Sequence, residues 1–203
     1  MEIKKQILKK NNTLILCVIL FFFTGFTFNK QENPYKEKDI IAWSDVDKLT
    51  WDFFKGKPHV SKQEAITCST IYCKYDDLDK SKLMMNIRAC FIKKEAWKKE
   101  KTPSDYLLNH EQKHFDITEI FTRKLRKILS DTVFKNESIA KKEIPKIIRN
   151  NNKIFNAFQE LYDKETNHSI NKEQQDFWDK KILDELNILK DYKNNIIVIN
   201  LKD

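Results

Sequence analysis

Two stretches in the first half of the chain, residues 65–75 and residues 83–92, alternate between apolar and polar residues. Strict alternation is typical of a β-strand that is buried on one face. The polar segment 76–82 has the composition of a turn, so the pattern predicts a β-hairpin. The positions expected to share a face are Ile66, Cys68, Thr70 and Tyr72 in the first strand and Leu83, Met85, Ile87, Ala89 and Phe91 in the second.

Apolar residues recur at helical spacing from about residue 105 onward. Ser104, which follows Pro103, is a favourable N-cap for the first of the predicted helices. A second helix is expected over residues 147–162, with Pro145 at its start or at a kink. A third is expected from Asn171, which fits a capping box with Gln174, to about Tyr192. The apolar stripe of the first helix consists of Leu107, Leu108, Ile117, Ile120, Phe121, Leu125 and Ile128, and that of the third of Trp178, Ile182, Leu186 and Leu189.

Shorter apolar segments complete the pattern. Residues 40–44 and 195–201 read as short strands, and Trp43 and Trp51 are expected to fill the core or its edge. Residues 29–39 are polar, contain a proline and are predicted to be a linker. We therefore predict one α+β domain over residues 40–203, in which a small sheet with a β-hairpin is followed by a helical half.

The first 28 residues have the pattern of an export signal. Four lysines precede an unbroken apolar run over residues 14–23, which is typical of a signal peptide. The run is shorter than the roughly 20 apolar residues that span a bilayer. Small residues are scarce near its end, where Gly25 and Thr27 are the best cleavage candidates, so an uncleaved membrane anchor is the alternative. Either interpretation predicts a periplasmic, secreted or membrane-anchored domain outside the cytoplasm.

The net charge of +8 says little about partners. The first 28 residues hold four lysines and one glutamate, so they account for +3 and leave +5 for the rest of the chain. No basic block there is dense enough to predict binding of a nucleic acid. The hydrophobic content of 40% is that of a folded protein.

The most informative motif is His-Glu-x-x-His at residues 110–114, on the first predicted helix. Positions i and i+4 lie on one face of an α-helix, so His110 and His114 can bind the same metal ion. Glu111 lies one residue further round, where it can reach a water molecule without being a ligand. Because imidazole nitrogens suit zinc, the motif predicts a Zn²⁺ site with Glu111 as general base. Two ligands leave the site incomplete, and a third must come from elsewhere.

The segment 162–168 offers candidates for the third ligand. His168 is the first choice because it ends a predicted helix, from which its ring can reach the motif helix. Asp163 and Glu165 are carboxylate alternatives. The predicted ligands are therefore His110, His114 and His168, with either carboxylate as a replacement for His168.

Taken together, these segments resemble the bacterial family catalogued as domain of unknown function 922, whose members are described as predicted secreted zinc-dependent proteases. The residues that carry the resemblance are IAWS at 41–44, LTWDFFKG at 49–56, DYLLNHEQKHFDI at 105–117, ETNH at 165–168, and Gln175 and Trp178. The resemblance covers residues 40–190 and implies a zincin-like fold and a peptidase activity. One departure is Ser169, at a position where the family pattern leads us to expect Gly. This residue belongs to the turn that sets the orientation of His168.

The motif and the resemblance together predict an exported zinc-dependent peptidase that hydrolyses peptide bonds with a zinc-activated water. In zincin-like folds an edge strand beside the metal helix pairs with an extended peptide, and residues 83–92 are the predicted strand. Tyr162 is a candidate oxyanion donor. The alternative is an inactive zinc-stabilised binding module of the cell envelope, in which a fourth protein ligand such as Asp163 closes the site. Glu111 favours the enzyme, because a structural site needs no carboxylate at that position.

Three cysteines lie beyond the export signal. If the hairpin is symmetric about Asp79, Cys68 lies opposite Cys90, and the two can form a disulfide in an oxidising compartment while Cys73 stays free. The alternative is three buried thiols.

Overall fold

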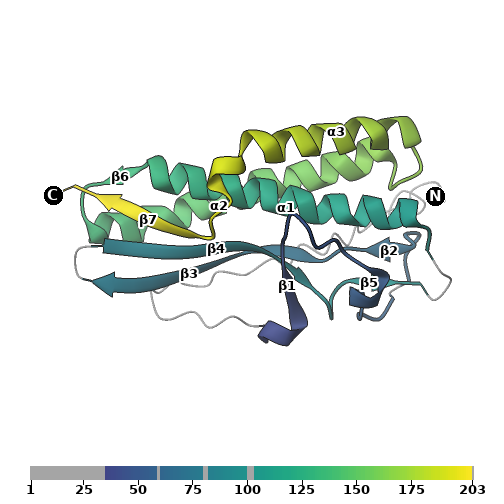
Figure 1. Cartoon of the computed structure of the whole chain (residues 1–203), viewed down its shortest axis with the longest axis horizontal. Coiled ribbons are helices and arrows are strands. Elements are labelled where there is room, and N and C mark those ends of the chain that lie inside the picture. The colour runs from purple at the N-terminus through teal and green to yellow at the C-terminus, as the bar shows by residue number, and fades with distance from the viewer. Residues whose placement is uncertain (1–34, 59, 80–81, 100–102, 203) are drawn as a thin grey trace, which may run out of the picture.

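The structure is a computed structural model that describes residues 35–58, 60–79, 82–99 and 103–202. Within these residues it combines short strands with three α-helices, which confirms the α+β class (Figure 1). The α-helices are α1 (Asp105–Asp131), α2 (Glu137–Thr166) and α3 (Lys172–Ile188). The strands are β1 (Ile40–Ala42), β2 (Ala65–Ile66), β3 (Ser69–Asp79), β4 (Lys82–Ile92), β5 (Trp97–Lys98), β6 (Val133–Phe134) and β7 (Ile196–Leu201), and 3₁₀ turns cover Glu37–Asp39, Trp51–Phe53 and Lys190–Tyr192.

β4 is the central strand of the main sheet, and the three α-helices lie over one face of it (Figure 1). β3 pairs with β4 in antiparallel fashion along one edge. Along the other edge, β1 pairs with the C-terminal part of β4 and β7 pairs with its N-terminal part, both antiparallel. β6 extends the sheet through a parallel pairing with β7, while β2 and β5 form a separate two-stranded sheet.

This pairing corrects two expectations. The hairpin turn is shorter than the predicted segment 76–82, because the strands stay paired as far as Asp79 and Lys82. The strand over residues 83–92 is also not an edge strand, because β4 has neighbours on both sides and offers no free backbone groups to a peptide. The prediction placed it at an edge because it precedes the motif helix directly. Within the described residues, it is the outer edge of β3 that no strand covers.

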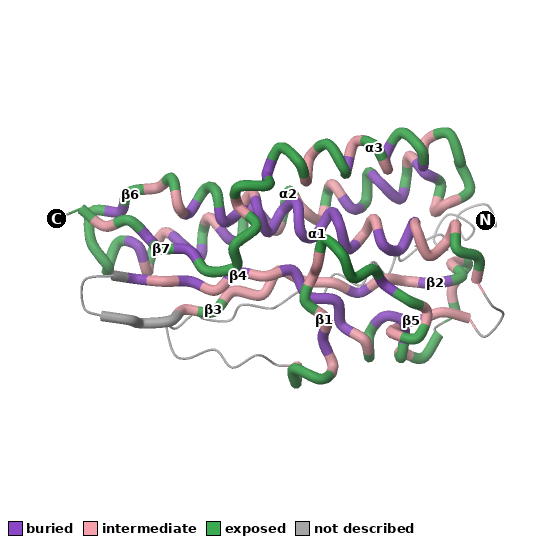
Figure 2. Tube along the Cα trace, viewed as in Figure 1, coloured by how far each residue is buried: buried purple, intermediate pink, exposed green. Residues whose placement is uncertain are grey.

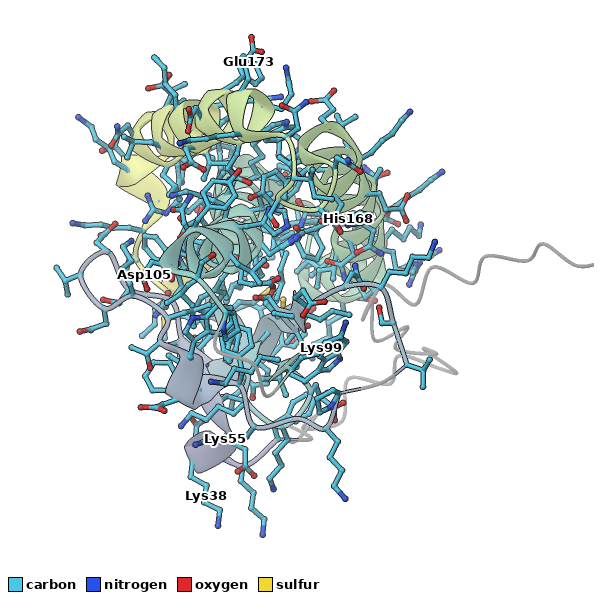
Figure 3. All side chains as sticks on the ribbon, turned by 90° about the vertical axis from the view of Figure 1, so that its right-hand side faces the viewer. Lys38, Lys55, Lys99, Asp105, His168 and Glu173 are labelled. Carbon is cyan, nitrogen blue, oxygen red and sulfur yellow. The ribbon has the colours of Figure 1, made fainter. Side chains whose placement is uncertain are left out.

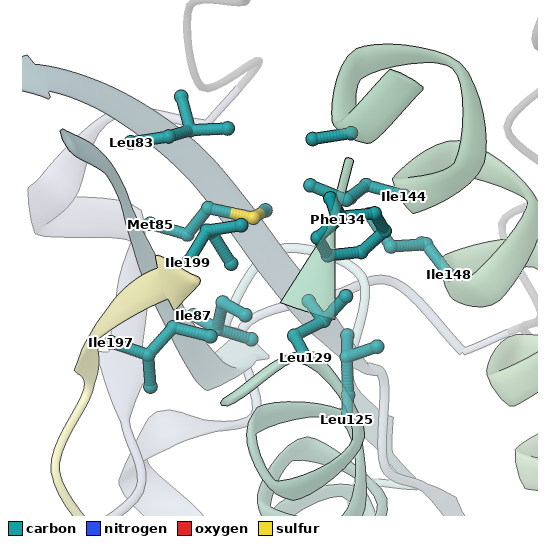
Figure 4. Packing of buried hydrophobic residues seen from close by; sticks show 11 residues of the cluster. Leu83, Met85, Ile87, Leu125, Leu129, Phe134, Ile144, Ile148, Ile197 and Ile199 are labelled. Atoms are coloured by element: carbon teal, nitrogen blue, oxygen red, sulfur yellow. The ribbon is translucent and has the colours of Figure 1, made fainter. Parts of the chain in front are cut away.

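The apolar face predicted for β4 is confirmed and packs against α1 and α2. Leu83, Met85 and Ile87 of this face meet Leu125 and Leu129 of α1 (Figure 4). Truncating one such buried side chain to alanine costs about 2–5 kcal/mol. On β3, Ile71, Cys73 and Tyr75 pack against this cluster, whereas Thr70 and Tyr72 lie on the other face with their partners Cys90 and Arg88. The whole cluster is Leu83, Met85, Ile87, Leu125, Leu129, Phe134, Ala140, Ile144, Ile148, Ile197 and Ile199.

Two further clusters surround the N-terminal half of α1. One lies toward the sheet and is built from Leu49, Phe54, Cys68, Ala89, Phe91, Ile92, Ala96 and Phe115. The other joins the three helices and is built from Ile117, Ile120, Phe121, Tyr162, Trp178, Ile182 and Leu189. As a result α1 is covered on nearly all sides, while much of α3 stays exposed (Figure 2).

Arg126 fastens α1 to the sheet and to the C-terminal segment. Its fully buried guanidinium pairs with Glu119 at 3.0 Å. It also donates to the backbone carbonyls of Ile87 and Tyr192 and to Oδ1 of Asn195. Charge-assisted bonds of this kind offset the cost of burying the charge, and they fix where β7 begins.

The helix starts follow the local sequence. Oγ of Ser104 accepts from the N–H of Leu107, and Oδ1 of Asn171 accepts from the N–H of Gln174, so both predicted N-caps are confirmed. α2 begins earlier than predicted, at Glu137, and Pro145 lies inside it.

The N-terminal end of the described fold lies slightly before the predicted domain boundary. The 3₁₀ turn Glu37–Asp39 contacts the sheet, where Glu37 pairs with Arg88 at 2.6 Å. The predicted export signal at residues 1–28 lies outside the described residues. Among the helices of the described ranges, none combines the length and the apolar character needed to cross a membrane.

The cysteine prediction is wrong in its register. Cys90 lies opposite Thr70, and Cys68 lies opposite Ile92, whose N–H donates to the carbonyl of Cys68. The turn is centred one residue later than Asp79, which shifts the facing residues by two and separates the cysteines. No disulfide involves Cys68, Cys73 or Cys90. Burial raises the pKa of Cys73 and of Cys90 to about 12, which makes both thiols unreactive.

We therefore expect Cys68, Cys73 and Cys90 to remain thiols even in protein recovered from an oxidising compartment. Alkylation after denaturation without reductant, followed by peptide mapping, should modify all three. A Cys68–Cys90 linkage in that map would contradict the strand register.

Candidate metal centre

The His-Glu-x-x-His motif spans the second and third turns of α1, on the stretch that α2 and α3 cover. His110 and Glu111 are each only 3% exposed. The rings of His110 and His114 lie 4.9 Å apart, as expected for side chains one turn apart on one face of a helix. α1 thus places both histidines in the protein interior, where their partners come from α2 and α3.

Asp163 of α2 brings a carboxylate oxygen to both rings. Its Oδ1 lies 3.3 Å from Nε2 of His110 and 3.1 Å from Nε2 of His114. Ligand atoms about 2.0–2.1 Å from a tetrahedral zinc ion are separated by roughly 3.3 Å, so both distances suit neighbouring ligands. Within the described residues, His110, His114 and Asp163 form a group whose ligand atoms all lie within 4.8 Å of one another.

Two glutamines hold the other nitrogen of each ring. Oε1 of Gln159 lies 2.7 Å from Nδ1 of His114, and Oε1 of Gln175 lies 2.9 Å from Nδ1 of His110. The Nε2 of Gln159 donates to the carbonyl of His114, and that of Gln175 donates to Asp179. These donations fix the orientation of both amides. The imidazole Nδ1 atoms must therefore carry protons, and the Nε2 lone pairs are available toward Asp163.

Two imidazole nitrogens that converge on one carboxylate oxygen require positive charge between them. Burial disfavours a charged His114, but Asp163 outweighs burial and raises the pKa of His114 to about 9. Burial of Asp163 acts against its ionisation as well, yet the surrounding histidines hold its pKa well below the usual range. A proton on His114 satisfies one contact, whereas a divalent metal ion would satisfy His110, His114 and Asp163 together. The residues present therefore fit a metal ion, and their mixed nitrogen and oxygen donors suit zinc.

His168 lies beside this group, at the end of the molecule where α2 turns into α3 (Figure 3). Its Nδ1 is 3.3 Å from Oδ1 of Asp163 but is not aligned for a hydrogen bond. The side chain is 38% exposed, against 7% for Asp163. Asp163 rather than His168 thus completes the compact group with His110 and His114, and His168 as the third ligand stays a prediction.

The turn that carries His168 is strained. Asn167, His168 and Ser169 have φ angles of 48°, 51° and 70°, the left-handed region that favours glycine. Ser169 stands where the family resemblance leads us to expect Gly, and the backbone there has the conformation that glycine adopts most easily.

Two other sequence candidates are engaged elsewhere. Oε2 of Glu165 accepts from Nε1 of Trp178 at 2.8 Å, away from the histidines. The hydroxyl of Tyr162 is buried and bonds to Gln175 and to the carbonyl of His110, and its ring stacks on that of His110. Tyr162 therefore supports His110 from behind, which does not suit the oxyanion donor suggested from the sequence.

Glu111 differs from the other buried acids near the motif. Its Oε2 is buried, and no described residue offers it a hydrogen bond. The hydroxyl of Thr67, just before β3, donates to the backbone carbonyl of Glu111. A buried polar oxygen without a partner is costly in a protein interior, so Oε2 can accept a group that the described residues do not supply.

The roles of Gln159 and Gln175 could not be assigned from the sequence. The available signal was that Gln159 lies four residues before Asp163, on the same side of α2.

Comparison with known proteins supplies no relative: no protein-family model matches the chain, and no match was found among curated proteins or solved structures.

Substitutions should rank the candidate ligands. We expect Asp163→Asn to weaken zinc binding by more than about 100-fold, because a ligand is lost, and His168→Asn to weaken it by no more than the roughly 10- to 100-fold typical of an outer partner. Glu165→Gln serves as the control and should have no effect. Chelator competition on each purified variant gives the dissociation constants. The reverse order for Asp163 and His168 would restore His168 as the third ligand.

The His114 pKa also sets a pH dependence. Below about pH 9, zinc must displace a proton from His114, so its apparent affinity should rise about tenfold per pH unit between pH 7 and 8.5, where an ordinary histidine site has levelled off. The raised pKa also means that this group stabilises the metal-free fold fully below about pH 6.5, and that the contribution is lost as the pH rises through about 9. A zinc affinity that is flat above pH 7 would contradict the assignment.

Proposed function

We propose that this chain is an exported zinc-dependent peptidase of zincin-like fold, with zinc held by His110, His114 and Asp163. The observation that carries the proposal is the convergence of two Nε2 atoms and one carboxylate oxygen beside a buried Glu111 whose Oε2 has no hydrogen-bond partner among the described residues. Three protein ligands leave a fourth position free, which is the arrangement of catalytic rather than structural zinc sites.

Glu111 is the general base in this proposal. A zinc ion at the site would supply Lewis acidity, which makes a water molecule easier to deprotonate and a peptide carbonyl easier to attack. The Glu111 carboxylate takes a proton from the attacking water. It then passes that proton to the nitrogen of the leaving amine as the peptide C–N bond breaks.

The outer edge of β3, which no strand covers within the described residues, is the edge that a peptide substrate would extend. Its first residue, Ser69, bonds to Thr118 of α1 through their hydroxyls at 2.7 Å, and the preceding Thr67 bonds to the backbone of Glu111. The edge therefore begins next to the motif helix. Addition of a strand supplies backbone hydrogen bonds that do not depend on the substrate sequence.

The second candidate function is a zinc-stabilised binding module of the cell envelope. The position of His168, 3.3 Å from Asp163, favours it, because a fourth protein ligand would close the coordination sphere. The unpaired Oε2 of Glu111 opposes it, since a closed structural site makes no use of a buried carboxylate oxygen without a partner among the described residues. The resemblance to domain of unknown function 922, whose members are described as predicted secreted zinc-dependent proteases, supports the peptidase and the export.

The decisive experiment replaces Glu111 with Gln. The change preserves shape and removes the base, so zinc content should stay at one equivalent while peptide cleavage falls by about 100- to 10,000-fold. Cleavage by the wild type should stop with a zinc chelator and return with added zinc.

The matched control is Glu165→Gln, the same chemical change at a carboxylate bonded to Trp178, which should keep full activity. Zinc retained with no cleavage of any peptide by the wild type would favour the binding module. Cleavage that survives Glu111→Gln would refute the assigned mechanism.

A further inference from the structure

His114 is held at two points by one side chain. Gln159 accepts from the ring at Nδ1 and donates to the backbone carbonyl of the same histidine, with distances of 2.7 Å and 2.9 Å. The amide cannot be reversed without placing two acceptors against each other at the carbonyl. Ring rotation and tautomer of His114 are thus fixed by a single residue of α2.

His110 is held at the same two points by a pair of residues. Gln175 of α3 accepts from its Nδ1 at 2.9 Å, and the hydroxyl of Tyr162 reaches its backbone carbonyl at 3.3 Å. Gln175 and Tyr162 also bond to each other, and Nε2 of Gln175 donates to Asp179 at 2.7 Å. The two histidines of the motif therefore have equivalent supports that come from different helices.

We propose that Gln159 and Gln175 are positioning residues of the metal centre, which present the Nε2 atoms of His114 and His110 to one metal ion. The inference rests on the zinc site of the proposed function but not on peptidase activity. Both supports are uncharged amides. A carboxylate in their place would draw the Nδ1 proton toward itself and make the imidazole a stronger donor, which reduces the Lewis acidity left for a water molecule. Amides keep the histidines oriented and leave that acidity largely intact.

The chain offers a matched control in Gln112, which lies on α1 between the two histidines of the motif. Gln112 and Gln159 are each 7% exposed, and each makes two hydrogen bonds through its amide. Gln112 binds the N–H of Leu49 and the carboxylate of Asp116, and neither bond involves a histidine ring. Gln112→Met therefore removes an equally buried amide and two hydrogen bonds while both motif rings keep their supports.

The test compares zinc binding in Gln159→Met, Gln175→Met and Gln112→Met, with the thermal midpoint of each metal-free protein as a measure of folding. We expect the first two to weaken zinc binding about 10- to 100-fold, and Gln112→Met to change it by no more than about twofold at a similar loss of stability. Equal weakening in all three, or unchanged binding in the first two, would overturn the proposal.

Gln159→Glu supplies the conservative variant. It keeps an acceptor for Nδ1 but loses the donation to the carbonyl of His114, so it should bind zinc more tightly than Gln159→Met and more weakly than the wild type. In ¹⁵N-histidine NMR spectra of the zinc-loaded proteins, the Nδ1–H of His114 should exchange slowly in the wild type and in Gln159→Glu, and rapidly in Gln159→Met. Rapid exchange in the wild type would contradict the proposed hydrogen bond.

These outcomes separate the positioning role from the proposed function. Zinc binding with the expected order of variants but no peptide cleavage sustains the positioning role and overturns the peptidase. Peptide cleavage by the wild type, with equal zinc affinities among the three Gln→Met variants, sustains the peptidase and overturns the positioning role. A wild type that binds no zinc overturns both.

Discussion

The burial of α1 on nearly all sides is the constraint on which the rest of the structure depends. The sheet covers one side and the other two α-helices cover the opposite side, so each polar group on α1 needs a partner inside the protein. Arg126 meets Glu119 toward the C-terminal end, and Asp116 accepts from Trp43 and from Gln112 nearer the motif. These pairs tie β1, the C-terminal segment and the sheet to one helix. The rigid frame that results is what a metal centre requires, because ligand positions must hold to within a fraction of an ångström.

Against this background, three side chains on α1 have a buried atom without a hydrogen-bond partner among the described residues: Tyr106, Glu111 and Arg123. Among the described residues, Glu111 is the buried acid with a carboxylate oxygen that has no hydrogen-bond partner, while His110 and His114 direct Nε2 toward an oxygen that also prefers positive charge. A core selected for stability alone would replace such groups with apolar residues at little cost. A metal ion held by His110, His114 and Asp163 would account for these groups. Arg126 differs from Glu111, because its buried guanidinium is hydrogen-bonded to groups of the chain.

The sequence allowed the α+β class, the N-caps Ser104 and Asn171 and the face of β4 to be predicted, because each depends on short-range spacing. The register of the hairpin could not be predicted, since a centre one residue away fits the same alternation and only long-range pairing decides. The strand order could not be predicted either, because the pairing of β7 with β4 joins segments more than 100 residues apart. This pairing makes β4 an internal strand. At the candidate metal centre, helical periodicity was enough to predict that His110 and His114 lie on one face of α1. The choice among the acids and His168 depended on the direction of α2, which the local pattern does not determine.

The turn from α2 to α3 is where a site with a free fourth position would differ from a site that His168 closes as a fourth ligand. Three successive residues with positive φ, none of them glycine, cost roughly 1–2 kcal/mol each. The backbone bonds of the turn recover part of this cost, since the N–H of His168 donates to the carbonyl of Asp163 at 2.9 Å. That bond also ties the third ligand of the proposed site to the histidine beside it, so one cannot move far without the other. A strained turn that keeps a half-exposed histidine next to a buried aspartate is not explained by its contribution to folding stability. It is well suited to bring a third, solvent-facing imidazole to the rim of the candidate metal centre, 3.3 Å from Oδ1 of Asp163.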